Sequence, residues 1–288
     1  MVQDRAFKQV DVFSAVPLLG NPVAVVLDGA GLDDAAMLRL ANWTNLSETT
    51  FIVPTTDTAA DYAVRIWTPQ RELPFAGHPT LGTAFAALEA GLVKPTNSKL
   101  IQQCAVGLVE ISVSDDWRNA GLSFRLPRHS VAPADDHNAL VMALGGHGAL
   151  KGAPTIVDVG PRWVIAEFAS ADAVAQLKPD LSAIADYNIR TETTGLTIFA
   201  EAGDGKGGLI VRSFAPTDGL MEDPVCGSGN GAVAAYRLHT GSIADGSAYI
   251  AQQGAQMGRD GYVSVRIDGT DVHIGGKCVT CIDGSARL

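Results

Sequence analysis

Short apolar runs recur along the whole chain and predict β-strands. They are rich in Val, Ile, Thr and aromatic residues and are bounded by Gly, Pro, Asn or Asp; examples are FKQVDVF, YAVRIWTP and GLIVRSFAP. Helical periodicity is rarer and falls at residues 32–45, 79–91, 137–146, 171–179, 181–188 and 229–241. Many short strands with a few helices predict an α+β protein built around curved sheets.

Two of these helices, at residues 79–91 and 229–241, are apolar around almost their whole circumference. They consist mostly of Ala, Leu, Phe, Val and Gly. A helix without a polar face is stable only when it is buried on all sides. We therefore expect each of the two helices to lie at the centre of a curved sheet.

The two apolar helices belong to an internal repeat. When the sequence is compared with itself at a shift of 150, eight of the thirty-two positions from 74 to 105 are identical, without a gap. The identical pairs are Pro74/Pro224, Gly77/Gly227, Ala84/Ala234, Leu88/Leu238, Gly91/Gly241, Gln102/Gln252, Gln103/Gln253 and Ala105/Ala255. Just upstream, Val-Arg-x-Trp-x-Pro at 64–69 matches Val-Arg-x-Phe-x-Pro at 211–216 at a shift of 147. A repeat of this length predicts two similar lobes rather than a solenoid of short units.

The chain is expected to cross between the lobes near Ser114–Asn119, after the first copy of the repeat. Residues 1–116 would then form the N-terminal lobe and residues 117–288 the C-terminal lobe, and the last C-terminal strand could return to the first lobe. Matching loops of two similar lobes would meet in the cleft between them. We expect the active site in that cleft.

Each apolar helix is preceded by a loop with the chemistry of an anion-binding site. The loops are Phe-Ala-Gly-His-Pro at 75–79 and Asp-Pro-Val-Cys-Gly-Ser-Gly at 223–229. Free N–H groups and the positive end of the helix dipole favour a carboxylate at such a helix start. Gly77, Gly227 and Gly229 have no side chain and let a ligand approach the backbone closely. The sequence therefore predicts that the two loops bind a small carboxylate.

Three titratable residues are candidates for proton transfer. His78 stands beside the first helix start, where an imidazole can relay a proton near neutral pH, and Asp223 occupies the corresponding entry of the second lobe. A helix cap and an Asp-Pro turn are the simpler interpretations of these two residues, but their symmetric placement favours a function. Glu48 lies in the polar turn Ser-Glu-Thr-Thr, and a partly buried carboxyl there would suit a general base. A plain turn is the competing interpretation of Glu48.

Charge and hydropathy exclude several other functions. The chain has 288 residues, of which 47% are hydrophobic, and a formal net charge of −10 without a basic run, so nucleic acid is not an expected partner. No apolar run approaches the roughly 18–20 residues that span a bilayer, and the N-terminus lacks the apolar stretch of a secretory signal. We expect a soluble cytoplasmic protein with no membrane partner.

The cysteines do not indicate a metal site. The chain has Cys104, Cys226, Cys278 and Cys281, and few thiols in a large cytosolic protein are expected to be reduced. The Cys278-x-x-Cys281 pair has no second pair to complete a zinc site and lies in an alternating strand pattern. We interpret these thiols as structural or incidental and expect no metal.

Three segments around the candidate residues resemble the signature segments of the PhzF family, the phenazine-biosynthesis isomerases and their relatives. They are N-L-S-E-T-T-F at 45–51, E-L-P-F-A-G-H-P-T-L-G at 72–82 and D-P-V-C-G-S-G-N-G at 223–231. The segments G-N-P-V-A-V at 20–25 and Q-G-x-x-M-G-R at 253–259 also resemble family patterns. The similarity covers essentially the whole chain, and the segments occur in family order.

This resemblance implies a diaminopimelate epimerase-like fold, in which two pseudo-symmetric lobes each wrap a curved β-sheet around a central α-helix. It also implies a homodimer, no cofactor, and isomerisation of a small cyclic carboxylate by proton transfer between carbons. The family's acid/base glutamate falls on Glu48, and its histidine and aspartate fall on His78 and Asp223. Its contacts to substrate fall on Asn21, Gly77, Gly227 and Ser228.

Cys226, which we count among the substrate-binding residues, departs from the family pattern. The phenazine enzymes usually carry Thr there, whereas in related epimerases a cysteine in this loop is one of two catalytic thiols. The matching position of the first lobe, 150 residues earlier, is Ala76, so a two-cysteine racemase is excluded. Cys226 acting with Glu48 as the second base stays open. Gly229-Asn230 also differs from the pair usual in the family, which leaves the choice of substrate open.

Three hypotheses follow from the sequence. The first is a cofactor-independent isomerase of the PhzF type, in which Glu48 removes a proton from carbon and returns it elsewhere while His78 and Asp223 orient the substrate. The second is an amino- or hydroxy-acid racemase, epimerase or dehydratase that uses the same site. The third is a non-catalytic relative that binds small acids.

Overall fold

The chain folds into two compact units. The computed structural model describes residues 2–127, 129–144, 150–203, 205 and 208–288. The first unit comprises Met1–Phe124 with Gly275–Leu288, and the second comprises Arg125–Ile274. The expected boundary at 116/117 therefore lies inside the first unit. The physical reason is that Trp117 packs edge-on against Phe85 of the central helix, with ring centroids 5.2 Å apart.

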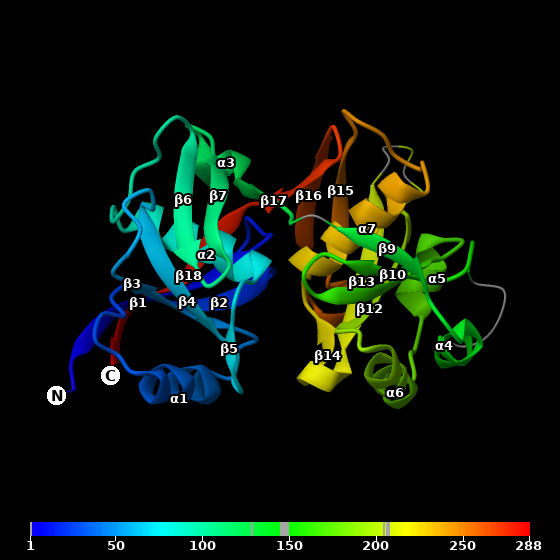
Figure 1. The fold of residues 1–288 in the computed structure, drawn as a ribbon, viewed down its shortest axis with the longest axis horizontal. Coiled ribbons are helices and arrows are strands. Elements are labelled where there is room, and N and C mark those ends of the chain that lie inside the picture. Colours follow the sequence, from blue (N-terminus) through cyan, green and yellow to red (C-terminus); the bar gives the residue numbers. More distant parts are fainter. Residues whose placement is uncertain (1, 128, 145–149, 204, 206–207) are drawn as a thin grey trace. The chain divides into compact units, whose positions relative to one another are not determined.

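The first unit wraps a mixed sheet around helix α2, Gly77–Glu89 (Figure 1). Its strands pair in the order β18-β1-β2-β3-β4-β6-β7-β8, with β5 added beside β4; β2–β3 and β4–β6 are parallel and the other pairs are antiparallel. The bounds are β1 Asp4–Val12, β2 Asn21–Val26, α1 Asp34–Thr44, β3 Thr49–Val53, β4 Tyr62–Trp67, β5 Glu72–Leu73, β6 Lys99–Cys104, β7 Gly107–Val113, α3 Trp117–Ala120, β8 Leu122–Arg125 and β18 Cys278–Arg287.

The second unit repeats this plan around helix α7, Gly227–His239. Its strands pair in the order β9-β10-β11-β12-β13-β15-β16, with β14 beside β13; β11–β12 and β13–β15 are parallel and the others antiparallel. The bounds are β9 Ser130–Pro133, α4 His137–Ala143, β10 Thr155–Asp158, β11 Arg162–Glu167, α5 Ala171–Gln176, α6 Leu181–Thr191, β12 Gly195–Glu201, β13 Leu209–Ala215, η1 Pro216–Asp218, β14 Leu220–Asp223, β15 Ala248–Gln253, η2 Ala255–Met257, β16 Gly261–Asp268 and β17 Asp271–Gly276.

The internal repeat predicted from the sequence is confirmed by the order and direction of the strands. In each unit a parallel strand pair (β2–β3 or β11–β12) is followed by an antiparallel strand (β4 or β13). A short strand, β5 or β14, pairs with that strand and leads into the central helix; we call it the hairpin arm. The strand after the helix, β6 or β15, lies parallel to β4 or β13. Both central helices span 13 residues and begin 150 residues apart. Each is followed by a glycine with positive φ, Gly91 at 71° and Gly241 at 72°, the backbone conformation that commonly ends a helix.

The glutamine pair of the repeat is one residue out of register in the structure. Ala63 lies opposite Gln103 in the β4–β6 ladder, whereas Ile210, 147 residues after Ala63, lies opposite Gln252 in the β13–β15 ladder. Gln103 therefore corresponds to Gln252, and the identity of Gln102-Gln103 with Gln252-Gln253 is not structural. A shift of one residue in a strand turns each side chain to the other face, and Gln102 and Gln253 are accordingly the two buried members.

Both central helices are buried along nearly their whole length, as their apolar composition predicts. Every residue of α2 from His78 to Leu88 is buried, and α7 is buried from Gly229 to Arg237. The first helix of the chain begins after Asp33, which caps α1 and accepts a hydrogen bond from Ala36 N at 2.8 Å. The expected helix at 137–146 ends at Ala143, and its last two positions lie outside the described residues.

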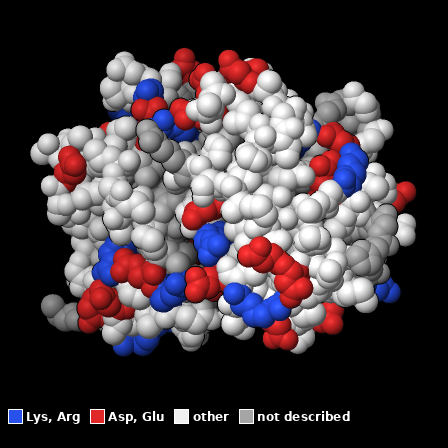
Figure 2. Space-filling model, turned by 45° about the vertical axis from the view of Figure 1, so that its right-hand side comes forward, with Lys and Arg blue, Asp and Glu red and all other residues white. Residues whose placement is uncertain are grey.

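The surface agrees with the charge pattern of the sequence. On the face drawn in Figure 2, Lys and Arg side chains lie among Asp and Glu side chains and do not form a continuous basic patch. None of the helices in the part of the chain that the structure describes is long and apolar enough to cross a membrane.

Close packing of α2 against the sheet predicts a large penalty for a side chain at Gly82. A Cβ there would lie 2.4 Å from Val23 Cγ1 and 2.9 Å from Val12 Cγ2. We expect Gly82→Val to lower the free energy of unfolding by about 2–3 kcal/mol, because overfilling a packed core forces neighbours from their rotamers. Urea titration measures this change. Gly284→Val, at a strand position with open space around the glycine, is the matched control and should change stability by less than about 0.5 kcal/mol. Equal stability of the two variants would contradict the packing argument.

Candidate active site

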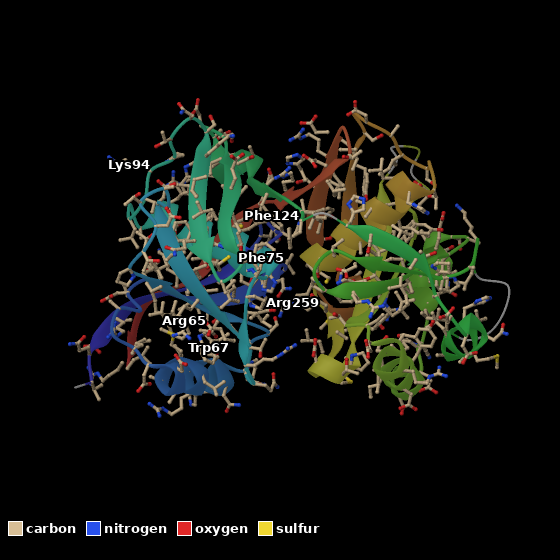
Figure 3. All side chains as sticks on the ribbon, in the orientation of Figure 1. Arg65, Trp67, Phe75, Lys94, Phe124 and Arg259 are labelled. Carbon is tan, nitrogen blue, oxygen red and sulfur yellow. The ribbon has the colours of Figure 1, made fainter. Side chains whose placement is uncertain are left out.

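The first helix start has no side-chain cap and lies beside an aromatic pair. Ala76 precedes α2 in an extended conformation and offers no side-chain cap to its N–H groups. A Cβ at Gly77 would lie 2.9 Å from the ring of Phe124, and Phe124 meets Phe75 edge-on with centroids 5.6 Å apart (Figure 3). Gly77 is thus required where the backbone passes an aromatic side chain, and the uncapped N–H groups suit a carboxylate.

Three of the predicted site residues come together beside this helix start. His78 is the second residue of α2, and its Nε2 lies 3.3 Å from Glu48 Oε2. Its Nδ1 lies 3.5 Å from Nδ2 of Asn21, the first residue of β2. His78 is only 7% exposed and Asn21 is fully buried. The simple interpretation of His78 as a helix cap is wrong, because its ring turns to Glu48 and Asn21.

His78 is neutral near physiological pH. Burial lowers the pKa of its imidazole from 6.5 to about 3, against a small opposing effect of the hydrogen bond to the backbone of Pro22. The contact with Glu48 is therefore not an attraction between two full charges. It is a contact between a neutral imidazole and a carboxyl group, whose facing atoms are both buried and lie 3.3 Å apart without the geometry of a hydrogen bond.

The second helix start is capped by the thiol of Cys226. Its Sγ accepts a hydrogen bond from Gly229 N at 3.2 Å. Burial and the neighbouring Asp223 raise the thiol pKa well above 9. Cys226 and Ala76 are the N-cap residues of α7 and α2, which confirms that the first unit offers no second thiol at the matching place.

Asp223 ends β14 and carries the most strongly perturbed carboxyl described in the second unit. Its Oδ1 accepts a hydrogen bond from Val225 N at 3.0 Å. Burial raises its pKa from 3.8 to about 6, and the charge of Glu222 adds to this effect, while hydrogen bonds from Cys226 and Val225 oppose it. The interpretation as a bare Asp-Pro turn therefore leaves out a buried acid that titrates near neutral pH.

Ser228 is held by a residue that the sequence analysis missed. Trp163 of β11 donates from Nε1 to Ser228 Oγ at 3.1 Å. Because the indole occupies a lone pair of that oxygen, the hydroxyl proton of Ser228 can point to another acceptor. Trp163 lies in an apolar strand pattern, RWVIAEF, and a buried Trp in such a pattern gives no signal that its N–H reaches a site.

Two amide side chains fix the loop before α7. Asn230 donates from Nδ2 to the carbonyl of Cys226 and to Gln253 Oε1, each at 2.9 Å. Gln253 in turn donates to the carbonyl of Asp223 at 3.0 Å. Gly229 has no room for a side chain, because a Cβ would lie 2.6 Å from Thr197 Oγ1. These contacts give Gln253 and the Gly229-Asn230 pair a structural role in shaping the site.

The predicted residues therefore form one group in each unit. Asn21, Glu48, Gly77 and His78 gather at the start of α2, and Asp223, Cys226, Gly227 and Ser228 gather at the start of α7. Among the described residues there is no group of three or more His, Cys, Asp or Glu side chains that could hold a metal ion.

The repeated sheet around a buried helix, with titratable side chains at both helix starts, defines an α+β protein of the diaminopimelate epimerase-like class, as the sequence predicts. The chain belongs to the phenazine biosynthesis-like protein family (PhzC-PhzF), whose model matches residues 10–284.

Relatives match almost the whole chain. It is 37% identical to antisense-enhancing sequence 1 of Schizosaccharomyces pombe, over 99% of both proteins. It is 34% identical to trans-2,3-dihydro-3-hydroxyanthranilate isomerase of Pseudomonas aeruginosa, over 97% of this chain and 98% of that protein. The crystal structure of a PhzF-family protein of Bacillus anthracis matches with a TM-score of 0.88 at 24% identity, over 99% of this chain and 100% of that one.

The raised pKa of Asp223 predicts a pH-dependent effect on stability. The folded protein binds this proton more tightly than the unfolded chain, so the stability that protonated Asp223 contributes is present below about pH 4 and is lost as pH rises through about 6. Relative to the Asp223→Asn variant, we expect the free energy of unfolding to fall by roughly 2–3 kcal/mol between about pH 4 and about pH 7, at about 1.4 kcal/mol per pKa unit.

Denaturant titrations of both proteins across this pH range measure the difference, in which the shared contribution of His78 cancels. A difference that is constant with pH would show that Asp223 titrates normally.

Proposed function

We propose that this protein is a cofactor-independent isomerase of the PhzF type that moves a proton between carbons of a small carboxylate. The observation that carries the proposal is the contact of 3.3 Å between Glu48 and the buried, neutral His78 at an uncapped helix start. Relatives of the chain that match over nearly its full length are named isomerases, which supports the same class of reaction.

Glu48 is the general base and acid in this proposal. Its carboxylate takes a proton from a substrate carbon and later returns the proton to a different carbon. Neutral His78 adds no positive charge beside Glu48, and its Nε2, 3.3 Å from Oε2, helps to place the carboxyl group. Asn21 contacts the other ring nitrogen and so keeps the imidazole in one orientation.

The helix starts bind the acidic part of the substrate. The N–H groups at the start of α2, which has no side-chain cap, and those of Gly227 and Ser228 suit a carboxylate and stabilise negative charge that develops as the proton leaves carbon. Asp223 orients and polarises a hydroxyl or amine of the substrate.

A racemase or epimerase reaction with Cys226 as one base is the second candidate, because the thiol contacts Ser228 and lies beside Asp223. The raised pKa of the thiol argues against it, since a buried neutral thiol is a weak base. Because Ala76 at the matching place offers no second thiol, this scheme uses Glu48 as its second base.

The central prediction concerns exchange of carbon-bound hydrogen. In D2O, NMR should show deuterium uptake into trans-2,3-dihydro-3-hydroxyanthranilate or a related cyclic or amino carboxylate, and Glu48→Gln should reduce the rate by at least about a hundredfold, the usual share of general acid–base catalysis. Glu110→Gln, which changes an exposed glutamate paired with Lys99, is the matched control and should keep full activity.

Each other outcome decides between the hypotheses. Full exchange by Glu48→Gln would disprove the proposed mechanism. Deuterium at the Cα of an amino or hydroxy acid that is lost in Cys226→Ser would establish the racemase reaction instead. Binding of small acids without exchange of any carbon-bound hydrogen would identify a non-catalytic protein.

The resemblance to PhzF proteins also leads us to propose a cytoplasmic homodimer. Sedimentation equilibrium of the purified protein is expected to give twice the chain mass of 30.0 kDa. A single species at the chain mass over the micromolar range would contradict the dimer.

A further inference from the structure

A forked arginine–glutamate pair occurs at the same place in both units. In the first unit Arg65 of β4 donates from Nε to Glu72 Oε1 at 2.7 Å and from Nη2 to Glu72 Oε2 at 2.6 Å. In the second unit Arg212 of β13 donates from Nε to Glu222 Oε1 and from Nη2 to Glu222 Oε2, each at 2.9 Å. The same nitrogen pairs with the same oxygen in both units.

The aromatic neighbour of each arginine is repeated as well. The Arg65 guanidinium lies 5.2 Å from the ring centre of Trp67 (Figure 3). The Arg212 guanidinium lies 5.0 Å from the ring centre of Phe214. Planar guanidinium groups both stack on rings and bind carboxylates in a fork. The Arg-x-aromatic motif that the repeat preserves at a shift of 147 therefore encodes this arrangement.

The remaining nitrogen of each arginine reaches the crossover helix of its unit. Nη1 of Arg65 donates to Asp34 in the first turn of α1 at 2.8 Å. Nη1 of Arg212 donates to the carbonyls of Val174 and Leu177 at the end of α5, at 3.0 and 2.8 Å. Each arginine thus ties together the sheet, the hairpin arm that leads to the central helix, and a crossover helix.

The Arg212–Glu222 pair lies next to the candidate catalytic residue Asp223 in the sequence and in the strand ladder. Glu222 immediately precedes Asp223, and Arg212 immediately precedes Ser213, the ladder partner of Asp223. Successive side chains of a strand point to opposite faces, so the Arg212–Glu222 pair lies on one face of the hairpin arm while Asp223 lies on the other. The pair can therefore place Asp223 through the backbone without touching the substrate.

Burial indicates that the second pair sets geometry more than it adds stability. The side chains of Arg212 and Glu222 are 5% and 15% exposed, against 27% and 35% for Arg65 and Glu72. The loss of hydration of a buried ion pair roughly cancels its Coulomb attraction, so such pairs contribute little net stability. A bidentate fork nevertheless allows few orientations, and that restriction is what a positioned acid requires.

We propose that the Arg212–Glu222 pair positions Asp223 and holds its carboxyl group in the orientation in which it accepts the hydrogen bond from Val225 N. The Arg65–Glu72 pair is its counterpart for the hairpin arm that leads to Gly77 and His78. The role of Asp223 in turnover rests on the proposed function, but its placement by the pair does not.

Amide hydrogen exchange at Val225 tests the placement without any substrate. The N–H of Val225 donates to the Asp223 carboxyl, so its protection reports whether that carboxyl stays in place. In Glu222→Gln and Arg212→Lys, which each keep part of the fork, we expect Val225 to exchange at least about tenfold faster, the factor of one charge-assisted hydrogen bond. Amides of the central strand β12 should keep their protection.

Glu72→Gln is the matched control, because it makes the same substitution in the same motif of the first unit. Its Val225 amide should exchange at the wild-type rate. Unchanged exchange of Val225 in both second-unit variants would overturn the proposal. Equal acceleration of all amides of the second unit would also overturn it, because the pair would then only stabilise the unit.

A kinetic cycle separates positioning from the proposed function. On a carboxylate that shows Glu48-dependent deuterium uptake, Glu222→Gln should lower kcat about tenfold with KM nearly unchanged, and should lower it no further in the Asp223→Asn background. Equal losses in both backgrounds would mean that the pair does not act through Asp223. Faster Val225 exchange without Glu48-dependent deuterium uptake would leave the placement intact and remove the proposed function alone.

Discussion

Burial of a helix with no polar face is the constraint on which this structure depends. Helices α2 and α7 consist mostly of small or apolar residues and are buried along nearly their whole length, so each must be enclosed by its sheet. The backbone of each helix is self-satisfied everywhere except at the ends. The N–H groups of the helix start are polar groups in a largely apolar interior, so they favour negative charge, and titratable side chains beside them are desolvated. Fold and site thus have a single physical origin.

The two helix starts have diverged within one architecture. At the first start, burial lowers the pKa of His78 to about 3, so the imidazole is neutral beside Glu48. At the second start, burial raises the pKa of Asp223 to about 6, so an acid titrates close to neutral pH. Desolvation favours the neutral form in both cases, and because one group is a base and the other an acid, the shifts run in opposite directions. Perturbed titratable groups of this kind are typical of acid–base sites.

Elements and site residues that depend on local pattern could be predicted from the sequence. The two apolar helices, the repeat and the candidate His78 at the first helix start fall in this class, whereas Asn21 was assigned by the family resemblance alone. Trp163 could not be found, because whether a buried indole N–H meets Ser228 depends on a contact between distant segments. The alignment of Gln102-Gln103 with Gln252-Gln253 was wrong by one residue, because it followed sequence identity and strand pairing cannot be read from identity. The bidentate Arg65–Glu72 and Arg212–Glu222 pairs were missed, because the repeated Val-Arg-x-aromatic motif shows the arginine but does not indicate which carboxylate it binds.

The identity of residue 226 shows how a packing role can resemble a catalytic signature. Cys226 occupies the N-cap of α7, where its sulfur accepts from Gly229 N at 3.2 Å. A side-chain acceptor is what an N-cap requires, and Thr is among the residues that serve best there. The threonine that phenazine enzymes usually carry and this cysteine can therefore fill the same structural role. Since burial raises the thiol pKa and favours its protonated form, a cysteine at this position is explained by capping alone.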